Sequence, residues 1–159
     1  MKFFGVENFV RITADCPLID PVIVDAVILN GLANELDYTG LSGRFPDGLD
    51  CTYFSERAIN LSALHATKKY QREHIGQYVE ENSSEFNCGE VKLFLDHADI
   101  RLTLDQVEDY DFLNNLIKIC GSHLSTPEIL KTLQLRPELM KINSNITRNE
   151  GLIKSKEQR

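Results

Sequence analysis

The segment Arg11–Asp20, which reads Arg-Ile-Thr-Ala-Asp-Cys-Pro-Leu-Ile-Asp, constrains the fold of this chain more than any other. It lies between two apolar stretches and predicts a strand over residues 6–13, a short loop and the start of a helix. Asp15 then lies just past the carboxyl end of the strand, where ligands collect in open α/β sheets. A carboxylate there can hold a divalent metal ion against phosphates. Taken alone, Asp15 is more simply explained as a residue that caps the turn before Pro17.

Strands and amphipathic helices alternate along most of the chain. Asp20 and Pro21 predict the N-cap and first position of a helix that runs to about Leu36. Further strands are expected at 37–39, 49–54, 90–95 and 100–104, and further helices from Ser55, over 71–79, from Val107 to Gly121 and over 125–133. Residues 40–48 are rich in turn residues and predict a loop. This order predicts a three-layer α/β fold with a mixed, largely parallel sheet.

The end of the chain differs in composition from the rest. From Arg136 onward the sequence is mainly polar. We expect residues 1–135 to form the α/β domain and residues 136–159 a C-terminal polar extension, with the final dozen residues mobile.

Composition excludes several classes of protein. The 159 residues carry a formal net charge of −7, which argues against a nucleic-acid polymer or a membrane surface as partner. The four cysteines have no spacing typical of zinc or a redox dithiol: Cys16, Cys51, Cys88 and Cys120. No apolar run is long enough to span a membrane. We therefore expect a cytoplasmic protein with reduced thiols.

A second aspartate, Asp105, directly follows the predicted strand 100–104. With Glu108 three residues later, it fits a capping box at the start of the next helix equally well. If the two strands are neighbours, Asp15 and Asp105 face one crevice and can share a hydrated magnesium ion.

Four motifs occur in order: Arg11–Pro21, Phe45–Asp50, Arg72–His74 and Arg101–Asp105. Together they resemble the carboxyl-terminal part of the spore coat polysaccharide biosynthesis protein F family, relatives of the cytidylyltransferases that activate acidic sugars. The stretch Pro137–Gly151 also resembles the tail of some members. The resemblance covers essentially the whole chain and implies a nucleotidyltransferase-like fold that lacks its N-terminal βα units.

The resemblance implies a reaction in which a sugar hydroxyl attacks the α-phosphorus of a nucleoside triphosphate. CTP is the favoured nucleotide, pyrophosphate leaves, and the product is an activated sugar for polysaccharide or surface-glycan biosynthesis. Asp15 and Asp105 match the family's catalytic aspartates and would be the ligands of Mg²⁺. The ion would orient the triphosphate and neutralise developing negative charge.

Substrate binding would fall to residues of the same motifs: Arg11, Asp47, Gly48, Asp50, Arg72, Glu73, His74 and Arg101. Asp47 and Asp50 could accept hydrogen bonds from sugar hydroxyls. Arg72 or His74 could face a sugar carboxylate or a phosphate. A solvated ion pair between Arg72 and Glu73 is the alternative explanation of that motif.

Full-length relatives begin with a glycine- and basic-residue-rich loop that cradles the triphosphate, and this sequence has no counterpart. The clustered glycines Gly40, Gly43 and Gly48 include no lysine and lack a strand-to-helix context. The chain therefore looks like the second half of the enzyme, truncated or split. We expect self-association or a second chain that supplies the N-terminal half.

Without a phosphate loop, phosphoryl transfer should lose most of its rate. A non-catalytic sugar-binding or interaction domain derived from such an enzyme is therefore the alternative function. An unrelated soluble α/β domain is a third hypothesis.

Overall fold

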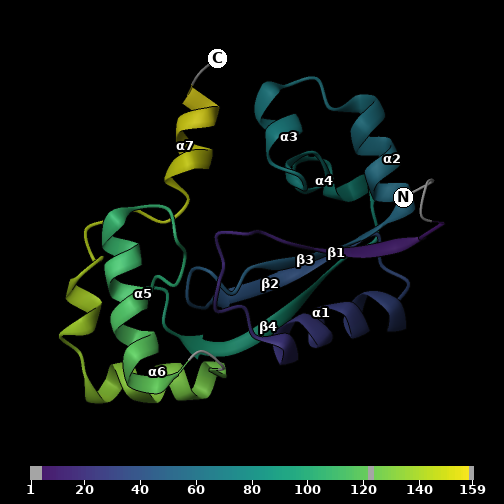
Figure 1. Ribbon diagram of the computed structural model, residues 1–159. Coiled ribbons are helices and arrows are strands. Elements are labelled where there is room, and N and C mark those ends of the chain that lie inside the picture. Colours follow the sequence, from purple (N-terminus) through teal and green to yellow (C-terminus); the bar gives the residue numbers. More distant parts are fainter. Residues whose placement is uncertain (1–4, 122–123, 158–159) are drawn as a thin grey trace.

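The computed structural model describes residues 5–121 and 124–157 (Figure 1). Its strands are β1 (Asn8–Ile12), β2 (Tyr38–Arg44), β3 (Cys51–Ser55) and β4 (Cys88–Asp96). Its helices are α1 (Pro21–Ala33), α2 (Glu56–His65), α3 (Lys69–Glu73), α4 (Gln77–Glu81), α5 (Val107–Cys120), α6 (Thr126–Leu135) and α7 (Glu150–Glu157), with short 3₁₀ turns at Ser83–Glu85 and Leu139–Lys141. Figure 1 shows α1 beneath the sheet and α2, α3 and α4 above it. The α/β class expected from the sequence is confirmed.

The sheet is mixed, as predicted, with the strand order β1-β3-β2-β4. β3 runs antiparallel to both β1 and β2, and β4 runs parallel to β2. Of the described strands, β1, β2 and β4 thus run in one direction and β3 runs against them, so the mixed, largely parallel sheet is confirmed. The predicted loop 40–48 was wrong in its first half, because Gly40 pairs with Thr52 on one side and Glu90 on the other. Pairing on both sides of β2 outweighs the turn preference of its glycines.

Helix α1 begins as the sequence predicts. The Oδ1 of Asp20 accepts a 2.9 Å hydrogen bond from the N–H of Val22. Its Oδ2 accepts bonds of 2.8 and 2.7 Å from the N–H and hydroxyl of Thr126. One buried carboxylate thus caps α1 and ties its start to the start of α6.

The main core lies between α1, the sheet and helices α5 and α6. Ile23 and Val27 of α1 pack in it with Phe112 of α5 and Ile129 of α6. A Cβ on Gly31 would lie 2.5 Å from the ring of Tyr53. This glycine therefore lets α1 approach the sheet closely.

The helix predicted over 71–79 is interrupted. α3 ends at Glu73 and α4 begins at Gln77. Gly76 between them has φ +108°. Glycine adopts this conformation readily, but a continuous helix cannot contain it.

Helix α5 begins at Val107 and ends before Gly121, as predicted. The capping group is not the predicted pair of Asp105 and Glu108. The Oδ2 of Asp109 instead accepts 3.1 Å bonds from the N–H groups of Asp105 and Gln106.

The strand predicted at 100–104 does not form as a regular strand. The segment is extended but makes one isolated bridge, between Arg101 and Asp47. The N–H of Leu102 donates to the carbonyl oxygen of Asp47 at 2.7 Å. Its hydrogen bonds thus go to loops rather than to the sheet.

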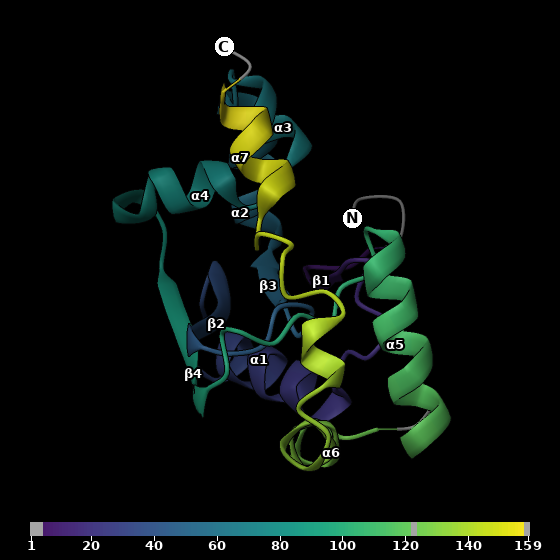
Figure 2. The same cartoon turned by 90° about the vertical axis from the view of Figure 1, so that its left-hand side faces the viewer.

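The expectation of a mobile tail was wrong for residues 150–157, which form α7. The Oγ of Ser155 donates a 3.2 Å hydrogen bond to Glu73, which holds this helix beside α3. Figure 2 shows α7 in front of α3. In the described part of the chain, no helix is long and apolar enough to cross a membrane.

Candidate functional site

A cavity of about 600 Å³ lies beyond the end of β1. Most residues that the motifs singled out line it: Arg11, Asp15, Asp47, Asp50, His74, Arg101 and Asp105. Three other predicted site residues, Gly48, Arg72 and Glu73, do not line it. The cavity therefore joins residues from all four motifs.

Asp15 and Asp105 are brought together by the backbone. The N–H of Leu104 donates a 2.8 Å hydrogen bond to the carbonyl oxygen of Asp15. The side chain of Asp105 is 46% exposed, and Asp15 is half-buried. Both therefore reach the cavity, although not from the ends of adjacent sheet strands as expected.

Beneath Asp105 lies a group that we call the Arg101 cluster: Arg101, Asp47, Asp105, Asp109 and Asn143. The guanidinium of Arg101 donates to Asp105 at 2.5 Å, to Asp47 at 3.0 Å and to Asp109 at 2.9 and 3.0 Å. The Nδ2 of Asn143 donates to Asp109 at 3.0 Å and to the carbonyl oxygen of Arg101 at 3.1 Å. Arg101 is buried and its charge is paired with these carboxylates. Its role is therefore to orient Asp105 rather than to bind a ligand in the cavity.

Asp109 is completely buried and ionised within this cluster. Burial raises the pKa of its carboxyl, but hydrogen bonds from Arg101, Asn143 and two backbone N–H groups outweigh burial and lower the pKa below its ordinary value. Neither Asp109 nor Asn143 was singled out from the sequence. Asp109 could have been predicted from its place as the third residue of α5, because a carboxylate at that position can accept hydrogen bonds from the free N–H groups at the start of a helix.

The loop that carries Asp47 and Asp50 packs tightly against residues 102–103. Gly48 has φ +95°, and a Cβ there would lie 2.7 Å from the carbonyl carbon of Leu102. Asp47 is buried between Arg101 and the Nε of Arg148, which lies 3.6 Å from its Oδ1. Asp50 has a side chain that is 49% exposed and lies open to the cavity. Of the two aspartates predicted to bind sugar, Asp50 has the more accessible carboxylate.

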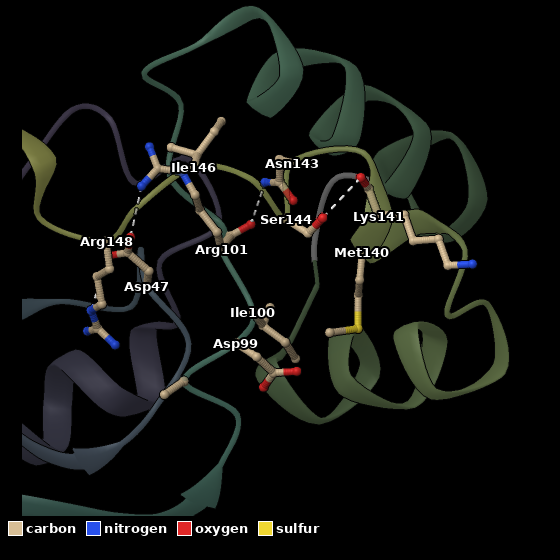
Figure 3. Close-up of a pocket in the computed structure, with 11 residues that line it drawn as sticks. Asp47, Asp99, Ile100, Arg101, Met140, Lys141, Asn143, Ser144, Ile146 and Arg148 are labelled. Atoms are coloured by element: carbon tan, nitrogen blue, oxygen red, sulfur yellow. Dashed lines mark hydrogen bonds and ion pairs between the residues drawn. The ribbon is translucent and has the colours of Figure 1, made fainter.

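A smaller cavity of about 330 Å³ shares Asp47 and Arg101 with the first. Figure 3 shows Met140, Lys141 and Ser144 around it. These residues belong to the segment that follows α6, so the C-terminal part of the chain borders both cavities.

The Arg72–His74 motif is divided by the structure. His74 lines the large cavity, and its Nε2 lies 3.2 Å from the Oγ of Ser155. Arg72 is exposed, and in the described residues no ion pair joins it to Glu73. His74 is thus the member of the motif placed to meet a ligand.

Several cavity residues were missed from the sequence. The hydroxyl of Tyr38 and the Nε2 of Gln77 each donate a 2.6 Å hydrogen bond to Glu80. Burial, and then the charge of Glu80, raise the pKa of Tyr38. Thr103 is buried at the cavity, and its hydroxyl has no hydrogen-bond partner in the described structure. Gln77 lies within the helix predicted over 71–79, and Glu80 directly follows that range.

The carboxylates suit a hard cation. Within residues 5–121 and 124–157, no group of three or more His, Cys, Asp or Glu side chains is arranged to hold a metal ion. Asp15 and Asp105 would therefore supply a minority of the ligands. Mg²⁺ commonly takes one or two carboxylates and completes its octahedron with phosphates and water, so this donor set fits that ion.

Comparisons with known proteins define the fold. No family model matches the chain. Its structure is similar to that of a cytidylyltransferase from Leptospira borgpetersenii serovar Hardjo-bovis, with a TM-score of 0.83 and 29% identity over 92% of this chain and 62% of that chain. This similarity and the mixed sheet define an α/β protein with a nucleotidyltransferase-like fold, as predicted.

The chain is also 31% identical over 148 residues to the uncharacterized protein MJ1063 of Methanocaldococcus jannaschii. That alignment covers 91% of this chain and 60% of MJ1063. The chain thus spans about three fifths of the length of each of these two relatives.

Proposed function

We propose that the chain contributes the metal and sugar side of a cytidylyltransferase-type nucleotidyltransferase. In this reaction a sugar hydroxyl attacks the α-phosphorus of a nucleoside triphosphate, with CTP favoured, and pyrophosphate leaves. The observation that carries the proposal is the shared cavity of Asp15 and Asp105 in a chain that is similar to a solved cytidylyltransferase. We further propose that the reaction belongs to polysaccharide or surface-glycan biosynthesis in the cytoplasm, and the resemblance of the four motifs supports this.

Asp15 and Asp105 are the residues that would hold Mg²⁺. When bound, the ion would orient the triphosphate and neutralise charge that develops during transfer. The bond from Leu104 to Asp15 holds the two segments together, and Arg101 fixes one oxygen of Asp105. The second oxygen of Asp105 and the carboxylate of Asp15 are then available for coordination.

The triphosphate requires positive charge that this cavity does not supply. Its lining includes the carboxylates of Asp15, Asp50 and Asp105, against the cationic Arg11. Arg101 also lines the cavity, but its guanidinium is already paired with Asp47, Asp105 and Asp109. We propose that the phosphate loop comes from outside these 159 residues, in the same polypeptide or in a second chain. Basic side chains and backbone N–H groups of such a loop would stabilise the transferred phosphoryl group.

The test is pyrophosphate release from CTP with Mg²⁺ and a panel of neutral, amino and acidic sugars. The chain would be assayed together with the polypeptide that carries the phosphate loop. The proposal expects release that depends on one sugar class and is abolished by Asp15→Asn or Asp105→Asn. Asp111→Asn is the matched control, since Asp111 is an exposed α5 carboxylate that does not line the cavity.

Sugar binding without release in the complemented protein would instead support the non-catalytic sugar-binding domain. Pyrophosphate release that persists in both Asp15→Asn and Asp105→Asn would rule out these residues as the ligands of Mg²⁺.

A further inference from the structure

The C-terminal segment that follows α6 is anchored to the Arg101 cluster and to the loop that carries Asp50. Asn143 is buried and bonded to Arg101 and Asp109. Arg148 donates a 2.8 Å hydrogen bond to the carbonyl oxygen of Phe45 and lies with its guanidinium 4.6 Å from the Phe45 ring. Figure 3 shows Asn143 and Arg148 at opposite ends of this stretch.

A third anchor lies in α7. The Oγ of Ser155 contacts the ring nitrogen of His74 and the carboxylate of Glu73, both at 3.2 Å. The segment therefore crosses from the Asp47–Asp50 loop to the α3–α4 loop. It touches residues of three of the motifs that predicted substrate binding.

Between these anchors, three residues face the large cavity: Thr147, Asn149 and Leu152. Arg148 lies between the first two and is directed at the protein, whereas its neighbours border the cavity. The same cavity is lined by Gln77 and Glu80 from α4. The three residues thus form part of the wall of this cavity, to which α4 also contributes.

Asn149 has two properties that distinguish it on this wall. Its φ is +58°, a conformation in which asparagine is several-fold enriched among residues other than glycine. Its side chain is exposed, and in the described structure its amide has no protein hydrogen-bond partner. An amide that borders a cavity in this way can both donate to and accept from a ligand.

We propose that Thr147, Asn149 and Leu152 form the wall that selects the acceptor sugar and that Asn149 contacts a hydroxyl of that sugar. This inference rests on the proposed function. The hydroxyl of Thr147, the amide of Asn149 and the apolar side chain of Leu152 suit a polyhydroxylated ring with polar edges and an apolar face. The carboxylates of Asp15 and Asp105, which would hold the Mg²⁺ that binds the phosphates, line the same cavity as this wall.

The test measures binding of neutral, amino and acidic monosaccharides to the 159-residue chain by saturation-transfer NMR and equilibrium titration. Asn149→Gly removes the amide and keeps a backbone that glycine adopts freely. We expect about fivefold weaker binding of the preferred sugar, because one neutral hydrogen bond is lost. The midpoint of thermal unfolding should not fall, since among the described residues the side chain has no hydrogen-bond partner.

Glu35→Gly is the matched control. Glu35 follows α1, also has positive φ at +50°, and does not line the cavity, so its replacement should leave sugar binding unchanged. Equal sugar affinity in Asn149→Gly and the unaltered chain would overturn this inference and leave the proposed function standing. Failure of the unaltered chain to bind any of the sugars would overturn both.

Discussion

The backbone N–H of Leu104 donates a 2.8 Å hydrogen bond to the carbonyl oxygen of Asp15. This bond joins two segments that are far apart in sequence and sets Asp15 beside the residue before Asp105. Because main-chain atoms make the connection, the spacing of the two backbone segments does not depend on either side chain. Either carboxylate can therefore be replaced without loss of the hydrogen bond that joins the two segments.

Asp15→Asn should abolish pyrophosphate release in the complemented protein while leaving thermal stability nearly unchanged. The carboxylate is half-buried, and its hydrogen-bond contact within the protein is a weak one, 3.7 Å from the Sγ of Cys16. Paired measurements of release and of the unfolding midpoint check this. A large fall in the midpoint would instead give Asp15 a structural role.

Asp109→Ala should destabilise the fold by about 3–5 kcal/mol, because removing one partner of a buried ion pair leaves the other charge uncompensated. Asp109 is fully buried and contacts Arg101 through both carboxylate oxygens. Urea unfolding measures the change. The exposed Asp111→Ala is the control and should stay within about 0.5 kcal/mol of the unaltered chain. Equal losses in the two variants would contradict the importance of the Arg101 cluster.

Acid should unfold the chain in part through Asp109 and Asp20. Burial raises the pKa of each, but hydrogen bonds outweigh it and lower both below the ordinary value. A lowered folded-state pKa gives stability that is complete above the unfolded pKa, about 3.9, and is lost as pH falls through the folded value.

Urea midpoints from neutral pH downward check this dependence. The unaltered chain should lose stability mainly below about pH 4, and Asp20→Asn should show a shallower decline because it has no proton to gain. An identical pH slope in both proteins would contradict the assignment.

Gly48→Ala should be markedly more destabilising than Gly121→Ala. Both glycines have positive φ, so both substitutions incur about 1–2 kcal/mol of backbone strain. At Gly48 the new Cβ would also meet the backbone of Leu102 at 2.7 Å, whereas at Gly121 no atom of the described residues, chain neighbours apart, lies within 4 Å. Denaturant unfolding of the two variants separates the steric cost from the conformational one. Equal destabilisation by the two substitutions would contradict this prediction, because it would show that the loop around Gly48 moves to accommodate the Cβ at no cost in stability.

Local signals in the sequence predicted the parts of the fold that local interactions determine. Asp20 with Pro21 gave the start of α1, and Gly121 gave the end of α5, because caps and breakers act within one turn. The extension of β2 through Gly40 was missed, since its cause is pairing with strands distant in sequence.

The same division holds for the candidate site. Asp15 and Asp105 could be proposed from their positions after apolar segments, and the cavity contains both. Asn143 could not, because its partners Arg101 and Asp109 lie more than thirty residues earlier. The cavity residues Thr147, Asn149 and Leu152 could not be predicted either, because the polar composition of their segment favoured a mobile tail.

The outer face of α1 gives the last prediction, which concerns association. Three apolar side chains at helical spacing are exposed there: Val22 at 72%, Leu29 at 64% and Leu32 at 51%. The buried side of α1 is apolar as well, and Asp25 is the charged residue among these exposed side chains. A helix that is apolar on most of its surface is normally covered on both sides. We therefore expect the isolated chain to self-associate, or to bind a second chain, through this face.

Leu29→Lys should shift the chain towards monomer in sedimentation velocity across a concentration series, without lowering the thermal midpoint. The charge interrupts the apolar face, while the buried side of α1, with Ile23 and Val27, stays intact. Leu64→Lys is the control, because Leu64 is equally exposed but lies on α2. An unaltered chain that sediments as a clean monomer at every concentration, without any added partner, would contradict self-association through α1.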